Sequence, residues 1–191
     1  ARLHEWMDTF QMNPKAICAD MAFHLPHDMQ AFYRMHNVKS CRLGAPKALK
    51  RFNVWGGYVL SDKNDLAPRE REIIILRTGY LCGSGYEWTQ HVEIGLREGL
   101  TEAEVEAIKT GADAPGWSAE DAALIRATDD LVGDHFVSEA RWTDLSFLTD
   151  KQRMDLVFTV GQYTQVSMML NTFGVQLDKG QTLDPDLDRR G

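Results

Sequence analysis

The chain has few cysteines and no long apolar run. Its three cysteines, Cys18, Cys41 and Cys82, are widely spaced among 191 residues, and no C-x-x-C motif occurs. This spacing does not support a disulfide framework, so we expect reduced, mostly buried thiols. Apolar runs are only a few residues long, against the roughly 20 that span a bilayer, and the first residues lack a basic stretch followed by an apolar one. The expected location is the cytoplasm.

Basic clusters and the common nucleotide and zinc motifs are missing as well. The formal net charge is -7, and the Lys and Arg residues are scattered rather than gathered in runs with aromatic residues. This pattern disfavours a nucleic acid or an anionic membrane as partner. The sequence contains no Walker loop, no G-x-G-x-x-G and no H-E-x-x-H. We therefore expect the partner to be a small molecule or another protein.

Helix caps give the clearest local pattern. At four positions a Ser or Thr is followed three residues later by Glu, Asp or Gln, which is typical of a helix start. These positions are Ser84, Thr101, Ser118 and Thr149. The helices predicted from them end near Glu98, Gly111, Leu131 and Phe173. No clear strand pattern is present, and with 43% hydrophobic and 26% charged residues we predict an all-α, single-domain fold.

The chain divides into three parts. Residues 1–36, interrupted by Pro14 and Pro26, are expected to form an N-terminal helical arm. Residues 37–177 are predicted to form the helical domain, and residues 178–191 an extended acidic tail. Apolar residues wrap around much of the helix predicted over residues 150–173, so this helix is expected to be central or to lie in a subunit interface.

Three ionisable residues stand in or beside the most apolar helical stretch. Glu72 precedes four consecutive apolar residues, and Glu87 and His91 are four residues apart on the next predicted helix, where they share a face. Charged groups are expensive in such surroundings unless they are paired or take part in chemistry. We therefore predict that Glu72, Glu87 and His91 form an acid–base cluster.

Each of these residues also has a simpler interpretation. Glu72 can pair with a neighbouring arginine, Glu87 stands where a capping-box Glu follows Ser84, and His91 can be held by Glu87 in a surface pair. A divalent metal between the three residues is a further alternative. It is disfavoured because no second histidine stands at ligand spacing.

The block from Glu72 to His91, with the continuation Gly99-Leu-Thr-Glu-Ala-Glu-Val105, resembles the carboxymuconolactone decarboxylase family, which includes the AhpD-like alkylhydroperoxidases. The resemblance is close over about 37–111 and extends more weakly to about residue 177. It implies a small all-helical protein that needs no metal or organic cofactor. It also implies self-association as a homo-oligomer, commonly a trimer or a hexamer.

This sequence departs from the peroxidase branch of that family at the thiols. The branch has a Glu on one helix and C-x-x-C-x-x-x-H at the start of the next, and the matching positions here are Glu72, Ser84, Glu87 and His91. The two thiols are therefore absent, although peroxide reduction by that mechanism requires them. The Tyr86-Glu-Trp88 filling of the motif is similar to a large subgroup of the family.

Without the two thiols, the part of the family's site that remains in this sequence is the part that transfers protons. It implies a cofactor-free lyase or isomerase that decarboxylates, isomerises or dehydrates a small carbonyl or lactone compound. We expect His91, with a pKa near the ordinary ~6.5, to abstract or deliver the proton. Glu72 supplies the complementary acid or base, and Glu87 fixes the imidazole tautomer. Backbone N–H groups of Gly83-Ser84-Gly85 are expected to stabilise the enolate.

Residues near the cluster are candidates for substrate binding. They are Tyr86, Trp88, Ser84 and Cys82, and each is also compatible with a purely structural role as packing or cap. One of the polar residues Gln162, Tyr163 and Asn171 on the long apolar helix is expected to reach the pocket. Two alternative functions stay open: an alkylhydroperoxidase-like oxidoreductase that uses Cys82, and a non-catalytic oligomer that binds a ligand or a partner protein.

Overall fold

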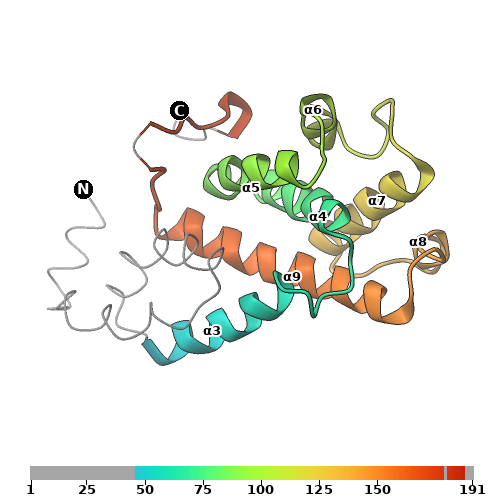
Figure 1. Ribbon diagram of the computed structural model, residues 1–191, viewed down its shortest axis with the longest axis horizontal. Helices are drawn as coiled ribbons and strands as arrows, with labels where there is room; N and C mark the ends of the chain where they lie inside the picture. Colours follow the sequence, from blue (N-terminus) through green and yellow to red (C-terminus); the bar gives the residue numbers. More distant parts are fainter. Residues whose placement is uncertain (1–45, 179, 188–191) are drawn as a thin grey trace, which may run out of the picture.

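The computed structural model describes residues 46–178 and 180–187, and these residues are entirely helical or irregular (Figure 1). The helices are α3 (Pro46–Val59), α4 (Pro68–Leu81), α5 (Gly85–Arg97), α6 (Glu102–Thr110), α7 (Ala119–Gly133), α8 (Glu139–Asp144), α9 (Asp150–Thr172) and the 3-10 turn η3 (Pro185–Leu187). The predicted all-α fold is confirmed for this part of the chain. The predicted arm over residues 1–36, and with it Cys18 and Cys41, lies outside the described residues.

Three of the four predicted caps form as expected. The hydroxyls of Thr101, Ser118 and Thr149 accept hydrogen bonds from backbone N–H groups three residues later, at 3.2, 3.0 and 3.2 Å. They begin α6, α7 and α9, whose ends lie within two residues of the predicted ends. Ser84 begins α5 but its side chain makes no capping bond. The short helix α8, capped by Ser138, was not predicted because it is only six residues long.

Helix α4 is the centre of the fold. Ile73, Ile74, Ile75 and Leu76 are all fully buried, although they point in different directions around the helix. Ile74 packs in a cluster with α7 and α9, Ile73 and Leu76 in a second cluster with α5 and α6, and Ile75 in a third with α3 and α9. Because α4 is covered on every side, any charged group on its inner turns is removed from water.

Helix α9 is also central. This is one of the two positions expected for it, the other being a subunit interface. It packs on α3, α4, α5 and α7 and runs along the length of the molecule (Figure 1). Asp155, fully buried on α9, accepts hydrogen bonds from the Tyr58 hydroxyl at 2.6 Å, the Asp65 backbone N–H at 2.8 Å and Lys151 Nζ at 2.8 Å. These bonds attach the start of α9 to the α3–α4 connection.

The segment after α9 folds back over the N-terminus of α5 (Figure 1). We call residues 175–187, without residue 179, the C-terminal strap. Leu187 is 5% exposed and packs in the same cluster as Trp88, and Lys109 of α6 forms an ion pair with Asp184 at 2.7 Å. The strap therefore packs on the core. Within the described residues, no helix has both the length and the apolar character needed to cross a membrane.

Candidate active site

The site is built on the helical hairpin of α4 and α5. Only Cys82, Gly83 and Ser84 connect the two helices, and Gly83 adopts a positive φ of 60°, which glycine reaches without strain. Two further glycines let the helices approach closely. A Cβ on Gly79 would lie 3.8 Å from Glu87 Cβ, and a Cβ on Gly95 would lie 3.7 Å from Glu72 Cβ. Each helix thus places a glycine opposite the other helix's carboxylate residue.

The three predicted acid–base residues converge inside this hairpin. His91 Nδ1 is 2.7 Å from Glu72 Oε2, and Nε2 of the same ring is 2.9 Å from Glu87 Oε1. Each of the three residues is only 2% exposed. The Glu72 contact is a well-formed hydrogen bond, whereas the Glu87 contact is an ion pair without hydrogen-bond alignment. Glu87 is therefore the more loosely held of the two carboxylates.

The pKa of the His91 imidazole differs from the ordinary value that was expected for it. Burial is the largest single influence and favours the neutral ring, but the charge and hydrogen bond of Glu72, together with the contact to Glu87, outweigh it. They raise the pKa of His91 to about 10. The expectation of a pKa near ~6.5 is wrong, because it ignored both carboxylates. At neutral pH the ring is an imidazolium with both nitrogens protonated, so Glu87 has no tautomer to select.

Tyr163 of α9 closes the cluster on one side. Its ring meets the His91 ring edge to face, with centroids 5.0 Å apart and an interplanar angle of 89°. Burial raises the pKa of the Tyr163 phenol well above its usual range, and the charges of Glu87 and Glu72 raise it further.

Within the part of the chain that the structure describes, no group of three His, Cys, Asp or Glu side chains has an arrangement suited to a metal ion.

The interpretation of Glu87 as a capping residue is wrong. Its side chain turns inward to His91, and Ser84 makes no side-chain cap bond. The backbone donors predicted at this turn are also largely occupied: Gly83 N–H donates to the Tyr80 carbonyl and Ser84 N–H to the Gly79 carbonyl. The Ser84 hydroxyl is buried without a hydrogen-bond partner among the described residues. The backbone N–H groups of Gly83 and Ser84 therefore hold the hairpin together and are not available to an enolate.

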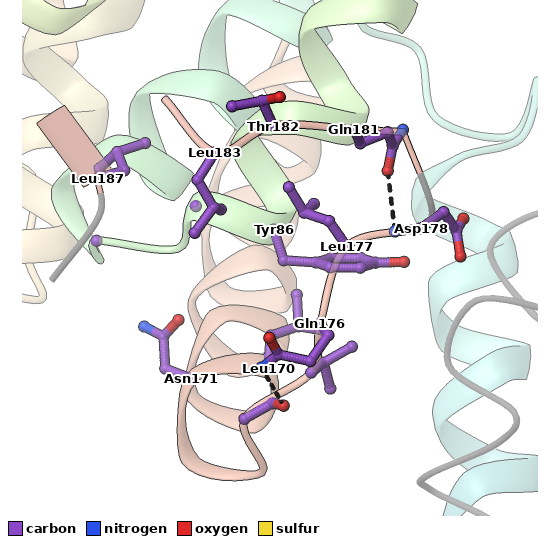
Figure 2. Close-up of a pocket in the computed structure, with 14 residues that line it drawn as sticks. Tyr86, Leu170, Asn171, Gln176, Leu177, Asp178, Gln181, Thr182, Leu183 and Leu187 are labelled. Atoms are coloured by element: carbon purple, nitrogen blue, oxygen red, sulfur yellow. Dashed lines mark hydrogen bonds between the residues drawn. The ribbon is translucent and has the colours of Figure 1, made fainter. Parts of the chain in front are cut away.

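A cavity of about 640 Å³ lies between the start of α5, the end of α9 and the C-terminal strap (Figure 2). Of the residues predicted to bind substrate, Tyr86 and Asn171 line it, together with Gln176, Asp178 and Gln181 of the strap. Trp88, Ser84 and Cys82 are not among its lining residues: Trp88 is buried in the core, and the Cys82 carbonyl accepts a hydrogen bond from Asn171.

The acid–base cluster itself is enclosed. Glu72, Glu87 and His91 line neither this cavity nor a second, smaller one. The smaller cavity, of about 10 Å³, lies between α3 and α9 and is lined by Tyr163, the residue that contacts His91. Tyr163 therefore lies between the buried cluster and this small cavity.

Comparison with known proteins supports the family. Residues 46–129 match the carboxymuconolactone decarboxylase family, so the resemblance found in the sequence is confirmed over that range. A crystal structure of a protein of unknown function from Agrobacterium tumefaciens, named there as a candidate antioxidant defence protein AhpD, has a similar fold, with 18% identity and a TM-score of 0.66. The match covers 71% of this chain and 94% of that chain. No curated protein matches the chain.

Sequence reasoning missed one residue near the site. Asn53 of α3 is 6% exposed and lines the smaller cavity with Gln162 and Tyr163. It stands between Phe52 and Val54, and no local pattern distinguishes it from a solvated polar residue on a helix. Of the three polar residues singled out on the long helix, Asn171 reaches the larger cavity and the other two reach the smaller one.

Proposed function

We propose that this protein is a cofactor-free enzyme that moves a proton at the carbon next to the carbonyl group of a small lactone or β-keto acid. The family resemblance supports an activity of the decarboxylase or antioxidant type in general. The single observation that favours proton transfer is the buried imidazole held between two carboxylates. A purely structural core gains little from such a cluster, because apolar side chains of similar volume stabilise a fold as well or better.

The three residues take different roles in this proposal. Glu87 is the base, because its contact with the imidazolium is longer and poorly aligned, which leaves its carboxylate freer to accept a proton from carbon. His91 carries the opposite charge beside it and returns a proton from Nε2 to the product carbon. Glu72 holds the other ring nitrogen through the 2.7 Å hydrogen bond and keeps the ring charged and oriented.

Electrons and atoms balance without an oxidant, a reductant or a cofactor, and decarboxylation takes up one proton from water. In isomerisation, the pair of the C–H bond moves into a carbon–carbon double bond, and the carbonyl π pair moves onto oxygen. In decarboxylation the pair of the C–C bond to the leaving carboxylate takes the same course, carbon dioxide departs, and the carbon is then protonated. Both routes pass through an enolate, and in both His91 protonates carbon as the electron pair on oxygen re-forms the carbonyl. Only isomerisation uses Glu87 as the base, and the proton that Glu87 takes up is passed back to His91. In decarboxylation the proton that His91 gives up is replaced from water.

The test is hydrogen–deuterium exchange next to the carbonyl, followed by NMR in D2O with a panel of small lactones and β-keto acids. We expect exchange with the wild-type protein and a loss of roughly 100-fold or more in Glu87→Gln, because general base catalysis contributes about 10²–10⁴-fold. Glu93→Gln is the matched control, since Glu93 is an exposed carboxylate on the same helix. Equal rates in Glu87→Gln and the control would rule out the proposed base. Peroxide consumption that disappears in Cys82→Ser would instead support the oxidoreductase alternative.

A further inference from the structure

The larger cavity, between the start of α5, the end of α9 and the C-terminal strap, has the size of a ligand site (Figure 2). Its volume of about 640 Å³ lies within the range of roughly 300–1,000 Å³ that is usual for such sites. Gly83, Gly85 and Gly174 are among its lining residues, and glycine has no side chain that could fill the space. The cavity is therefore large enough for a small organic molecule.

Specific contacts join the walls of this cavity to each other. Asn171 Nδ2, at the end of α9, donates a hydrogen bond to the Cys82 carbonyl at 3.0 Å. Gln90 Nε2 of α5 donates a hydrogen bond to Gln181 Oε1 of the strap at 2.7 Å. Lys109 of α6 attaches the strap a second time through its ion pair at 2.7 Å. The cavity is thus enclosed by elements that are attached to one another, and it is not a gap beneath a loose chain end.

The lining of the cavity combines apolar surface with hydrogen-bond acceptors. Leucine side chains from α9 and the strap supply apolar surface, and Tyr86 adds an aromatic ring. Asn171 and Gln176 each donate a side-chain N–H group to a backbone carbonyl of the protein at 3.0 Å. Their side-chain oxygens are left to accept hydrogen bonds from a ligand. These features suit a ligand that has an apolar body and a polar group that donates hydrogen bonds.

The charge at this cavity is negative. Asp178 is the only side chain ionised at neutral pH among its described lining residues, and it forms no ion pair with another residue that the structure describes. The hydroxyl of Tyr86 points toward the side of the cavity where Asp178 lies (Figure 2). Burial raises the pKa of the Tyr86 phenol, and the charges of Asp178 and Glu87 raise it further. An anionic ligand would therefore be repelled, because no lysine, arginine or histidine stands among the described lining residues.

We propose that this cavity binds a small organic cation, an amine whose ammonium group lies beside Asp178 and whose apolar body packs on Tyr86 and the leucines. An ammonium group donates three hydrogen bonds, which matches the carboxylate and the amide oxygens of the lining. The face of an aromatic ring also attracts a nearby cation. This site goes beyond the proposed function and does not rest on it.

The test uses three probes that share an indole ring and a two-carbon linker. Tryptamine is a cation at neutral pH, tryptophol is uncharged, and indole-3-propionate is an anion. Binding to the full chain is measured by isothermal titration calorimetry. We expect tryptamine to bind most tightly and indole-3-propionate most weakly. In about 1 M NaCl the difference in affinity between tryptamine and tryptophol should shrink, because salt screens a solvent-exposed pair of charges.

Two pairs of variants locate the site. Asp178→Asn should weaken tryptamine binding by about two- to fivefold, the range of an exposed ion pair, and leave tryptophol binding unchanged. Asp62→Asn is its control, because Asp62 is an exposed carboxylate that does not line the cavity. Thr182→Trp places a large side chain in the cavity and should weaken the binding of both probes by about tenfold or more. Thr172→Trp, at an exposed threonine outside the lining, should leave both affinities unchanged.

Several outcomes would overturn this site. They are no tryptamine binding by the wild type at millimolar concentration, equal affinities for tryptamine and indole-3-propionate, and an affinity for tryptamine that Asp178→Asn or Thr182→Trp leaves unchanged. Exchange at carbon in Glu87→Gln reports on the acid–base cluster alone, so each of the two proposals can fail while the other stands.

Discussion

At the scale of single residues, the decisive feature is the charge state of His91. Both ring nitrogens face carboxylates in a site removed from water, so the proton stays on the ring at neutral pH. The imidazolium is a weak acid that becomes effective only when an adjacent carboxylate has taken a proton from the substrate. In the proposed function, this arrangement assigns the role of base to Glu87 rather than to His91.

The raised pKa of His91 predicts how stability depends on pH. The folded state holds this proton more tightly than the unfolded chain, so the contribution is complete below the ordinary pKa of ~6.5 and is lost as pH rises through about 10. Between roughly pH 7 and pH 10 we expect a loss of about 3 kcal/mol in the free energy of unfolding. In Glu87→Gln the pKa of His91 should be lower than in the wild type, and the free energy of unfolding should begin to decline at lower pH. Urea unfolding curves at a series of pH values measure both proteins, and parallel profiles would contradict the assignment.

The identity of these residues could be predicted from the sequence, but their energetics could not. Motif spacing pointed to Glu72, Glu87 and His91, because a residue's place on a helix follows from its number. Whether Glu72 or Glu87 makes the stronger bond to the ring depends on the rotation of α4 against α5. The position of Asn53 beside the smaller cavity could not be predicted for a similar reason, because Gln162 and Tyr163, which line that cavity with it, are more than a hundred residues away in the sequence.

At the scale of helices, the approach of α4 and α5 sets the geometry of the site. A Cβ on Gly95 would meet Leu100 Cδ1 at 2.9 Å and Leu76 Cδ1 at 3.3 Å, and both leucines are buried and have little room to move. Leu76 belongs to α4, so the absence of a side chain at Gly95 allows the two helices to pack this closely, whereas Leu100 lies in the connection after α5. The sequence showed a glycine there, but gave no indication of which residue it would face.

Gly95→Ala should accordingly push the two helices apart. We expect a loss of about 1–3 kcal/mol in the free energy of unfolding from overpacking, together with reduced exchange activity as Glu72 moves from His91. Gly161→Ala in α9 is the control, because a Cβ there meets nothing within 4 Å, and it should stabilise the fold by about 0.5–1 kcal/mol. Thermal and chemical unfolding of the two variants gives the comparison. Similar effects at both positions would show that the contact at Gly95 is not restrictive.

At the scale of the whole molecule, the C-terminal strap completes the larger cavity. Lys109 is its main ionic attachment, since its Nζ lies 2.7 Å from Asp184 and 3.1 Å from Asp186. We expect Lys109→Met to keep the packing over Trp88 but to loosen the strap, with a cost of about 1–2 kcal/mol. Hydrogen-exchange mass spectrometry should show faster exchange over residues 180–187, with Lys47→Met, a change at an exposed lysine of α3, as the control. Equal protection in both variants would count against this role of Lys109.

Self-association is a further expectation at this scale, and it stays a prediction. Several large apolar side chains are exposed on the described part of the chain, among them Val54 at 66%, Phe136 at 67% and Met168 at 63%. Contiguous apolar patches, rather than single exposed residues, are typical of a surface that another chain covers, so the expectation rests on the family resemblance. Light scattering coupled to size-exclusion chromatography should give a mass that is a multiple of 21.7 kDa, most simply three or six times. A mass of one chain would contradict the expectation.

All three ionisable groups of the site lie within one uninterrupted stretch, residues 68–97, folded as a helical hairpin. The walls of the two cavities draw mainly on α3, α9 and the strap, although Gly83, Gly85 and Tyr86 of the hairpin also line the larger one. In the proposed function, proton transfer and ligand choice are therefore encoded largely in different parts of the chain. Substitutions in α3 and α9 can change which compound is bound while the hairpin keeps its chemistry, so related proteins with the same hairpin need not share a substrate.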